Sequence, residues 1–490
     1  AGVKVLPTQW VYALKTDLCG TVSQKARVVV CGNHQTPDQY ETTFSPTARA
    51  GTIRTLCAIA VQQGYNISTF DIRAAFISAM LPQTPEIYIQ LPQGYGLPAG
   101  KCARLNRALY GLRNASATYH KKLHGWFMDH GFDQVDDDGV LFRKTFPRAD
   151  GGDADVIIVS MFVDDGLSLY SNEQHYKDFM TEFGKTFTLS NDAVLVNEKY
   201  LGMQFKYDRA AGRLSICQSQ YIESMLERFG MTDLQKRHMA QTPLEPDIYL
   251  SAADACDASN PSNIGQIRNY QQLVGSLLFL SCWGRPDITY ATNQCARFMS
   301  CPGPSHFASA RRILRYLART KDAELVFKRQ PSSSAIKLEC YVDADHAGDP
   351  DTRLSVSGYI LMLSGGPIVW ASRRQTISAV SSAESEWYAA SAAALEIQYM
   401  RRLLEQLGFP QDTPTTCWED NSATIWASTG QSSFRRLKHI DTRVHRLRQM
   451  VQQKILTLVK IPSADNISDV FTKSVKTDTF VTLTSRFMHF

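Results

Sequence analysis

The feature that most constrains this chain is a pair of adjacent aspartates between two apolar segments. Residues 156–162 and 167–170 are mostly Val, Ile, Leu and other apolar residues, which is typical of buried strands, and Asp164 and Asp165 stand between them. Two carboxylates at a turn between buried strands are costly to place there. A divalent metal ion removes that cost, because hard oxygen ligands suit Mg²⁺. The sequence therefore predicts a β-hairpin whose turn carries metal-binding carboxylates.

A third aspartate, Asp71, directly follows another largely apolar segment. Taken alone, an Asp-Asp pair at a turn is usually ordinary turn chemistry, and Asp71 by itself is a weaker signal still. Three convergent carboxylates, however, can hold the two metal ions that clamp the attacking and leaving oxygens during phosphoryl transfer to a 3′-hydroxyl. Asp71, Asp164 and Asp165 are therefore candidate ligands of two Mg²⁺ ions, for which Mn²⁺ is a substitute.

The composition bounds the class of protein. A chain of 490 residues suggests two to four structural units. The 52 Lys and Arg residues against 47 Asp and Glu give a formal charge of +5, so a polyanion has to be held by local patches rather than by a general field. The eleven cysteines include no C-x-x-C pair, which argues against zinc, and we expect them to be reduced thiols of an intracellular protein.

Two further features concern processing and location. No run of about 18 apolar residues is present, so no membrane-spanning segment is expected. The chain begins Ala-Gly-Val without an initiator Met, as an excised segment, a processed polyprotein or a cloning boundary would.

Three segments punctuate the chain. Residues 147–154 are predicted to form a hairpin loop, residues 251–263 a surface loop or linker, and residues 330–336 an interdomain linker. After the linker we expect strands at 338–342, 355–363, 367–371, 416–419 and 455–460, a long helix at 379–407, a basic helix and a last helix. Ser381 and Glu384 have capping-box spacing near the start of the long helix. The sequence thus predicts a C-terminal α/β domain of about 150 residues.

Four acids of this domain occupy a strand, the long helix, the end of a strand and the last helix. They are Asp343, Glu386, Asp420 and Asp469. This is the order of the acids in ribonucleases H, and together they can bind two Mg²⁺ ions, activate a water and cleave the RNA strand of a hybrid. Asp345 and Glu384 are alternatives, since each lies two residues from a chosen acid. Strand alternation places Asp343 and Asp345 on the same face, so the pattern does not separate them, whereas Glu384 has the simpler role of a helix cap.

Many short motifs, in order, resemble the copia-type LTR retrotransposon reverse transcriptases with their ribonuclease H. In the N-terminal half these motifs are residues 10–15, 25–29, 43–46, 52–54, 71–76, 108–113, 162–165 and 200–205. Farther along they are residues 274–278, 285–290, 312–317, 355–359, 370–375 and 438–441. The match runs nearly end to end, and so many ordered motifs are highly specific.

The resemblance implies roles for the residues of the first motifs. Asp71, Asp164 and Asp165 would hold the polymerase metal ions with help from the Ile72 carbonyl. Phe76, preceded by Ala74 and Ala75 in the same substrate site, would lie beneath the sugar and exclude ribonucleotides.

Lys25 and Arg27 would bind the triphosphate, and their spacing on a strand puts them on one face, as a shared phosphate target requires. Solvated strand charges are the simpler alternative. Tyr110 and Gly111 would border the nascent base pair, with core packing as the rival role for Tyr110.

The chain departs from the family pattern in three places. Asn114-Ala115-Ser116 replaces the usual Gln followed by Ala-Pro, which puts the template-side contacts in doubt. Phe162 stands where Tyr is commoner, and both neighbouring carboxylates remain. The histidine that many ribonucleases H carry before the last acid is absent from residues 464–466, so product release is expected to depend on other groups.

Two basic segments are candidate phosphate-binding surfaces. Residues 311–319 carry four arginines in a predicted amphipathic helix, and residues 435–448 form a second basic stretch. Such surfaces give salt-sensitive affinity that does not depend on sequence. Solvated helix faces would have the same composition.

The full prediction is an α/β (α+β) protein in which a right-hand polymerase precedes a ribonuclease H-like domain. Fingers and palm are expected in residues 1–218, the thumb or connecting region in 219–329, the linker in 330–336 and the ribonuclease H domain in 337–490. The enzyme would copy RNA and DNA into cDNA from dNTPs and degrade the RNA of RNA–DNA hybrids.

The expected partners are an RNA template, an RNA–DNA hybrid, DNA and a tRNA primer, with a homodimer or an integrase partner also compatible and no membrane. The expected location is the cytoplasm within virus-like particles, from which the complex could enter the nucleus. A decayed or domesticated copy that binds nucleic acid without catalysis is the alternative, and so is an enzyme active only as a ribonuclease.

Overall fold

The computed structural model describes residues 4–16, 22–92, 94–95, 100–135, 139–149, 151–232, 239–330, 336–430 and 441–490. The chain divides into two compact units. Unit 1 contains residues 1–48 and 67–194, and unit 2 contains residues 49–66 and 195–490. Helices and strands occur together in both units, as the predicted α/β (α+β) class requires. The predicted right-hand arrangement stays a prediction.

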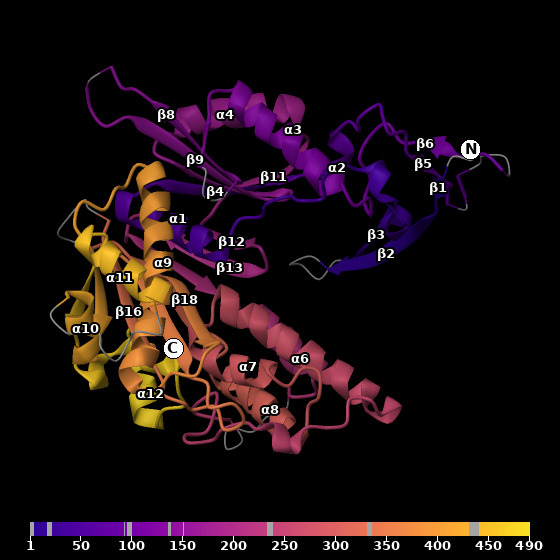
Figure 1. The fold of residues 1–490 in the computed structure, drawn as a ribbon. Helices are drawn as coiled ribbons and strands as arrows, with labels where there is room; N and C mark the ends of the chain where they lie inside the picture. Colours follow the sequence, from indigo (N-terminus) through magenta and orange to yellow (C-terminus); the bar gives the residue numbers. More distant parts are fainter. Residues whose placement is uncertain are drawn as a thin grey trace. The chain divides into compact units, whose positions relative to one another are not determined.

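Unit 1 is built on a six-stranded sheet with the order β11-β4-β10-β9-β8-β7. The strands are β4 (Asn66–Ile72), β7 (Asp133–Gln134), β8 (Leu141–Phe146), β9 (Asp155–Phe162), β10 (Asp165–Tyr170) and β11 (Leu189–Val194). The helices α3 (Ala115–Asp129) and α4 (Glu173–Thr186) lie on the same side of this sheet in Figure 1. The predicted strands at 156–162 and 167–170 and the hairpin loop at 147–154 are confirmed, because β8, β9 and β10 form consecutive antiparallel pairs.

Two smaller sheets and a short helix complete unit 1. They are a β2–β3 hairpin (Thr8–Thr16 and Val22–Val30), a sheet of β1 (Val5–Leu6), β5 (Tyr88–Ile89) and β6 (Ala103–Arg104), and α2 (Ala75–Ser78). Leu6, Val30, Ile89 and Leu112 belong to one buried hydrophobic cluster that joins the hairpin, the small sheet and the segment before α3.

Unit 2 contains a four-stranded antiparallel sheet and a bundle of helices. The strands are β12 (Asn197–Tyr200), β13 (Met203–Asp208), β14 (Arg213–Cys217) and β15 (Glu324–Lys328). The helices are α5 (Ser219–Arg228), α6 (Ile264–Trp283), α7 (Thr289–Ala296) and α8 (Pro304–Arg319), of which α6, α7 and α8 lie together in Figure 1. Because β15 pairs with β14, the predicted boundary after residue 218 does not coincide with a division between compact units. The domain boundaries as functional divisions stay predictions.

The rest of unit 2 is a five-stranded mixed sheet with the order β18-β17-β16-β19-β20. Its elements are β16 (Leu338–Ala344), β17 (Val356–Leu363), β18 (Gly366–Arg374), α9 (Ser382–Gln406), β19 (Thr415–Glu419), α10 (Ser422–Ser428), α11 (Asp441–Gln452), β20 (Leu456–Lys460) and α12 (Thr477–Thr484). Each strand predicted for this region is confirmed within a few residues, and so is the long helix. The predicted linker at 330–336 lies mostly outside the described residues.

Helix α1 (Ala50–Gln63) belongs to unit 2 and packs against β14, β15 and β18. Its Arg54 is 5% exposed and donates hydrogen bonds to the carbonyls of Ile368 (2.7 Å), Cys282 (2.8 Å) and Trp283 (3.0 Å). Burial lowers the pKa of Arg54 to about 9. One arginine therefore joins α1, the end of α6 and strand β18.

Three other expectations concern the predicted linker at 251–263, the cysteines and membrane-spanning segments. The segment 251–263 holds two short 3-10 helices and is tied to residue Asp351 by the Ser251 hydroxyl at 2.6 Å, so it is not a free linker. The cysteines in the described ranges form no disulfide. No helix among the described residues has the length and apolar character needed to span a membrane.

Candidate functional sites

The Asp-Asp pair lies at a two-residue hairpin turn. Phe162 pairs with Asp165 across the β9–β10 ladder, so Val163 and Asp164 form the turn, and Val163 adopts a left-handed conformation with φ of 60°. The backbone N–H of Ile72 donates to the Asp164 carbonyl at 2.9 Å, which places the end of β4 beside the turn. The structure therefore brings Asp71 and the Asp-Asp turn to one edge of the sheet.

The charges around Asp164 come from two segments that are distant in sequence. Burial raises the pKa of Asp164, and the negative charge of Asp71 adds to the rise. The positive charges of Arg27 and Lys25 on β3 oppose this rise. Both predicted phosphate-binding cations thus act electrostatically on the candidate metal site, and their binding role stays a prediction.

The carboxylates of Asp71, Asp164 and Asp165 do not offer three oxygens that all lie within 4.8 Å of one another. Instead the Ser190 hydroxyl contacts the Asp71 carboxylate from a β-bulge in β11. Sequence reasoning missed Ser190, because no local sequence pattern indicates which residue of β11 lies opposite Asp71.

Phe76, which is predicted to lie beneath the nucleotide sugar, belongs to a cluster of aromatic rings. Phe76 on α2 lies 5.0 Å from the Tyr110 ring and 6.0 Å from the Tyr119 ring, measured between centroids. The Arg27 guanidinium stands over the Tyr110 ring at 5.2 Å. Tyr110 is half-buried, so it combines the packing role with a surface that a ligand can reach.

The two alanines before Phe76 differ in exposure. Ala75 begins α2 and is 2% exposed. Ala74 is exposed and has a left-handed backbone with φ of 55°, which turns the chain from β4 into the helix.

Gly111 is required by a close approach of two backbones. Its φ is +90°, and a Cβ at this position would lie 2.0 Å from the Val30 carbonyl oxygen. The Val30 N–H donates to the Tyr110 carbonyl at 2.8 Å in the same contact. Gly32 approaches from the other side, since its Cβ would lie 2.0 Å from the Gly111 carbonyl oxygen. The two glycines anchor the base of the β2–β3 hairpin against the segment that carries Tyr110.

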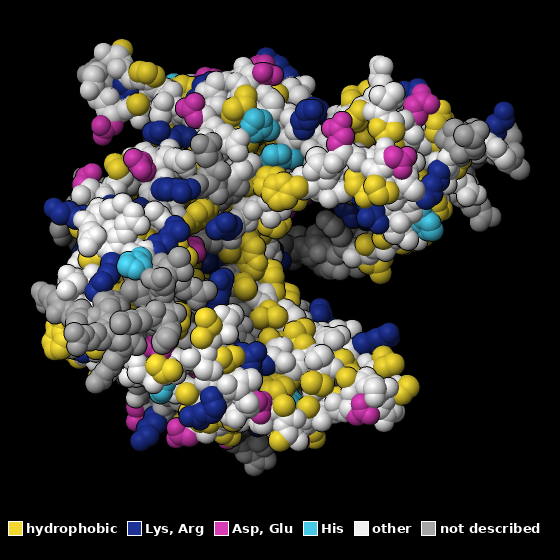
Figure 2. Space-filling view, in the orientation of Figure 1, with side chains coloured by type: hydrophobic (Ala, Val, Ile, Leu, Met, Phe, Trp, Pro, Cys, Tyr) yellow, Lys and Arg dark blue, Asp and Glu magenta, His cyan; other side chains and the backbone are white. Residues whose placement is uncertain are grey.

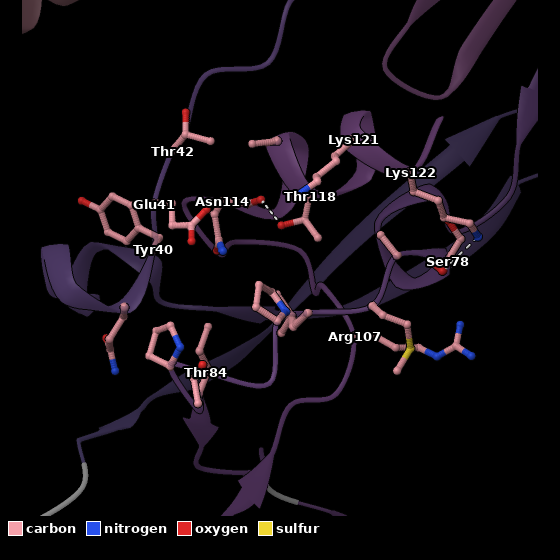
Figure 3. A pocket seen from close by; sticks show the side chains of 18 of the residues that line it. Tyr40, Glu41, Thr42, Ser78, Thr84, Arg107, Asn114, Thr118, Lys121 and Lys122 are labelled. Atoms are coloured by element: carbon pink, nitrogen blue, oxygen red, sulfur yellow. Dashed lines mark hydrogen bonds between the residues drawn. The ribbon is translucent and has the colours of Figure 1, made fainter. Parts of the chain in front are cut away.

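A cavity of about 850 Å³ opens next to α2 and the start of α3 (Figure 3). Arg107, Lys121 and Lys122 line it, and the Lys122 ammonium donates to the Ser78 carbonyl at 3.1 Å. Asn114 also lines the cavity, is 7% exposed, and its Oδ1 has no hydrogen-bond partner among the described residues. The position where the chain departs from the family pattern thus lies in the wall of a cationic cavity.

In unit 2, Asp343, Glu386 and Asp420 converge. One carboxylate oxygen from each lies within 4.8 Å of the others, and this is the only such group of three acidic, His or Cys residues in the described part of the chain. Asp343 and Glu386 are buried on β16 and α9, and Asp420 directly follows β19. Glu386 Oε2 has no hydrogen-bond partner among the described atoms. Three clustered carboxylates with an unsatisfied buried oxygen are a donor set that fits a hard divalent cation.

Burial of several like charges controls the protonation of this group. Burial raises the pKa of Glu386 to about 11, and the neighbouring carboxylates Glu419 and Asp343 add to the rise. Burial likewise raises the pKa of Asp469 to about 7, with Asp343 adding and Lys473 opposing. Sequence reasoning missed Glu419, which is fully buried on β19 beside Asp420. Alternation along β19 places Glu419 on the same face as the buried Cys417, and this signal was available in the sequence.

The fourth predicted acid, Asp469, adjoins the group through Asp343, with which it shares a hydrogen bond. It was expected to open the last helix. The structure corrects this, because Asp469 lies in the short 3-10 helix η9 (Ile467–Phe471) and the last helix α12 begins at Thr477. The Asn466 side chain caps η9 by accepting from the Ser468 N–H and donates to the Val342 carbonyl at 2.9 Å, so this turn is fixed to β16.

The two alternative acids have other contacts. Asp345 lies past the end of β16, where its carboxylate accepts from the backbone N–H of Val356. Glu384 accepts from the Val380 N–H at 2.8 Å, while the Ser381 side chain caps α9 by accepting from the Glu384 N–H. Neither belongs to the converging group.

The predicted basic surfaces are only partly described. On α8, Arg311 is exposed and Arg312 pairs with Glu245 at 2.6 Å, while Ile313 and Leu314 are buried, so the helix is amphipathic as expected. Residues 435–440 of the second basic stretch lie outside the described residues, and residues 441–448 belong to helix α11. Figure 2 shows Lys and Arg side chains in small groups rather than one continuous field on the visible face.

Comparisons with known proteins identify the family. Residues 1–246 match the family model described as reverse transcriptase (RNA-dependent DNA polymerase). The Pol polyprotein of transposon TNT 1-94 from Nicotiana tabacum is 31% identical over 98% of this chain and 35% of its own length. This chain belongs to the copia-type reverse transcriptases.

Other relatives agree with this assignment. The Pol polyprotein of transposon RE1 from Arabidopsis thaliana is 29% identical over 99% of the chain and 32% of its own length. The transposon Ty1-DR6 Gag-Pol polyprotein from Saccharomyces cerevisiae is 23% identical over 99% of the chain and 27% of its own length. This reverse transcriptase therefore spans about a third of the curated relatives that it matches.

Two solved structures resemble the chain weakly. A foamy viral protease-reverse transcriptase in complex with double-stranded DNA has a TM-score of 0.24 at 13% identity, covering 97% of this chain and 68% of that one. LC11-RNase H1 in complex with an RNA/DNA hybrid has a TM-score of 0.23 at 15% identity, covering 28% of this chain and 94% of that one. At these scores neither likeness adds to the assignment.

Proposed function

We propose that this reverse transcriptase is an active DNA polymerase on RNA and DNA templates and that unit 2 carries a ribonuclease H site. The observation that carries the polymerase proposal is that the Arg27 guanidinium stands over the Tyr110 ring at 5.2 Å while the charges of Arg27 and Lys25, from a distant segment, oppose the rise in the pKa of Asp164. The convergence of Asp343, Glu386 and Asp420 supports the ribonuclease proposal.

In the polymerase site, the carboxylates of Asp71, Asp164 and Asp165 would have to turn toward one another from their present positions to hold Mg²⁺ or Mn²⁺, with the Ile72 carbonyl assisting. The ions would neutralise the developing negative charge at the attacking and leaving oxygens. Arg27 and Lys25 bind the triphosphate through charge-assisted hydrogen bonds. Phe76, supported by Tyr110 and Tyr119, limits the room beneath the sugar and so selects deoxynucleotides.

We place the single-stranded template in the cavity beside α3. Arg107, Lys121 and Lys122 offer three cations to its phosphates, which gives affinity without sequence preference. The unpartnered Asn114 Oδ1 would accept a hydrogen bond from a template base or sugar. Asn114 then takes the place of the family's usual Gln.

In the second site, Asp343, Glu386, Asp420 and Asp469 would hold the metal ions that activate a water for cleavage of the RNA strand. The high pKa of Glu386 means that it carries a proton at neutral pH in the protein alone, which it releases when a divalent cation binds. The expected partners are a tRNA primer, dNTPs and an RNA–DNA hybrid, with dimerisation or an integrase partner compatible with a segment of a Pol polyprotein. We further propose that the protein acts in cytoplasmic particles.

Primer extension on poly(rA)/oligo(dT) with dTTP and Mg²⁺ tests the polymerase assignment. Wild type is expected to extend the primer, and Asp164→Asn to lose extension while keeping cleavage of an RNA–DNA hybrid. Asp133→Asn, which changes an exposed acid of the same sheet, is the matched control and should extend normally. Extension by Asp164→Asn at the wild-type rate would contradict the assignment of the metal site.

The alternative of a decayed copy that only binds nucleic acid predicts a different result. Wild type would then bind the template-primer but extend nothing, and Mn²⁺ would not raise its melting temperature. A folded protein with an intact cluster of carboxylates should be stabilised by the ion, because the ion binds the folded state and not the unfolded one.

A further inference from the structure

The strongest unassigned feature of unit 2 is a lysine inside the acidic group. The Lys473 ammonium lies 3.0 Å from Asp469 Oδ1 and 3.8 Å from Asp343 Oδ2. The preceding residue, Thr472, is fully buried, and its hydroxyl contacts the Asp343 carboxylate and the Asp469 carbonyl. The turn after η9 therefore directs Lys473 into the space between these two acids.

The exposure of the three side chains differs in an informative way. The side chains of Asp343 and Asp469 are 3% and 12% exposed, whereas that of Lys473 is 43% exposed. The ammonium thus reaches inward while much of its stem faces solvent. A lysine stem is flexible and its ammonium is a compact charge, so the group can leave this position without a change in the backbone.

A divalent cation on these carboxylates would compete directly with Lys473. Mg²⁺ binds carboxylate oxygens at about 2.0–2.1 Å. The ammonium is already within hydrogen-bonding distance of one of the same oxygens, so the two cations would repel each other strongly at that separation. Loading of the site therefore requires the ammonium to move toward its exposed side, where a phosphodiester would approach.

We propose that Lys473 is a displaceable counter-ion of the ribonuclease site, which holds Asp343 and Asp469 together before metal binding and then turns outward to contact the phosphate of the RNA strand. This inference rests on the proposed ribonuclease function. In the second state Lys473 contacts substrate, and it supplies a cation near the last acid, where the chain lacks the histidine of many ribonucleases H. No bond is formed or broken by Lys473 itself.

Metal titration of the full chain tests the first half of the proposal. All proteins carry Asp164→Asn to weaken the polymerase site, and Mn²⁺ binding is measured by isothermal titration calorimetry without nucleic acid. Lys473→Met is expected to bind Mn²⁺ about tenfold more tightly, because it removes a positive charge next to the ion, and to melt at a lower temperature in EDTA. Lys473→Arg, which keeps a cation, should bind Mn²⁺ nearly as wild type does.

The control is Lys337→Met, which removes an exposed lysine paired with Glu339 at 2.9 Å beside the same sheet and should change neither quantity. Lys473→Gln is a second neutral variant for the case that Lys473→Met does not fold. If both neutral variants bind Mn²⁺ as tightly as wild type or more weakly, the proposed counter-ion role of Lys473 is wrong.

Single-turnover cleavage of an RNA–DNA hybrid at saturating Mg²⁺ tests the second half. Cleavage should slow in Lys473→Met and partly recover in Lys473→Arg, and an unchanged rate would overturn the phosphate contact. If wild type cleaves no hybrid although Lys473→Met binds Mn²⁺ more tightly, the proposed ribonuclease function is wrong, while the proposed counter-ion role of Lys473 is confirmed.

Discussion

Substitution of Gly111 by Ala is predicted to separate the polymerase activity from the ribonuclease activity. The added Cβ would lie 2.0 Å from the Val30 carbonyl oxygen and 2.6 Å from a Val29 methyl group, so backbone atoms have to move by more than 1 Å to reach ordinary contact at about 3.4 Å. The φ of +90° adds about 1–2 kcal/mol for a residue with a Cβ. Relief of the clash moves Val30 away from Tyr110.

That movement breaks the 2.8 Å hydrogen bond from the Val30 N–H to the Tyr110 carbonyl. Val30 is 2% exposed, so its N–H would be left without a partner, at a cost of about 1–3 kcal/mol. Together these effects predict a loss of roughly 2–5 kcal/mol for unit 1. The β2–β3 hairpin would also shift, and with it Lys25 and Arg27.

The assay is primer extension at varied dTTP together with hybrid cleavage and thermal unfolding. Gly111→Ala should raise the KM for dTTP and lower the melting temperature of unit 1, while hybrid cleavage by unit 2 stays at the wild-type rate. Gly125→Ala is the matched control, since its Cβ would meet nothing within 4 Å inside α3, and it should be neutral or slightly stabilising. An unchanged KM and melting temperature in Gly111→Ala would refute the reasoning.

Three further predictions concern unit 2. In EDTA, wild type should lose stability relative to Asp469→Asn as the pH rises from about 4 to about 7, because the raised pKa makes the folded state bind the Asp469 proton more tightly than the unfolded state does. Denaturant unfolding at several pH values should show a difference of up to roughly 4 kcal/mol in the free energy of unfolding. No pH-dependent difference would mean that the pKa of Asp469 is normal. Asp287→Asn should destabilise the protein by about 3–5 kcal/mol, since it leaves the buried Arg285 cation uncompensated, and an unchanged melting temperature would contradict this. Arg54→Met should lower the melting temperature by leaving three carbonyls unsatisfied, at about 1–3 kcal/mol each, and a more stable variant would show that desolvation of the cation dominates.

The strands of the C-terminal region could be predicted closely from sequence. The apolar run that becomes β17 and the long helix that becomes α9 are local patterns, and Ser381 marks the start of the helix as a cap. The same is true of the β9–β10 hairpin, whose two apolar strands are separated only by a short polar turn. Such signals depend on residues a few positions apart, so one chain suffices to read them.

The sequence by itself therefore determined the family, the order of most strands and the identity of the candidate acids. Tertiary structure decided that Asp343, rather than Asp345, joins Glu386 and Asp420, because β16 ends between the two aspartates. It also decided the Gly32–Gly111 approach and the place of α1, whose Arg54 bonds to carbonyls more than 200 residues away. These contacts join segments with no local relation, and periodicity along the chain carries no information about which distant backbone will lie opposite a given side chain.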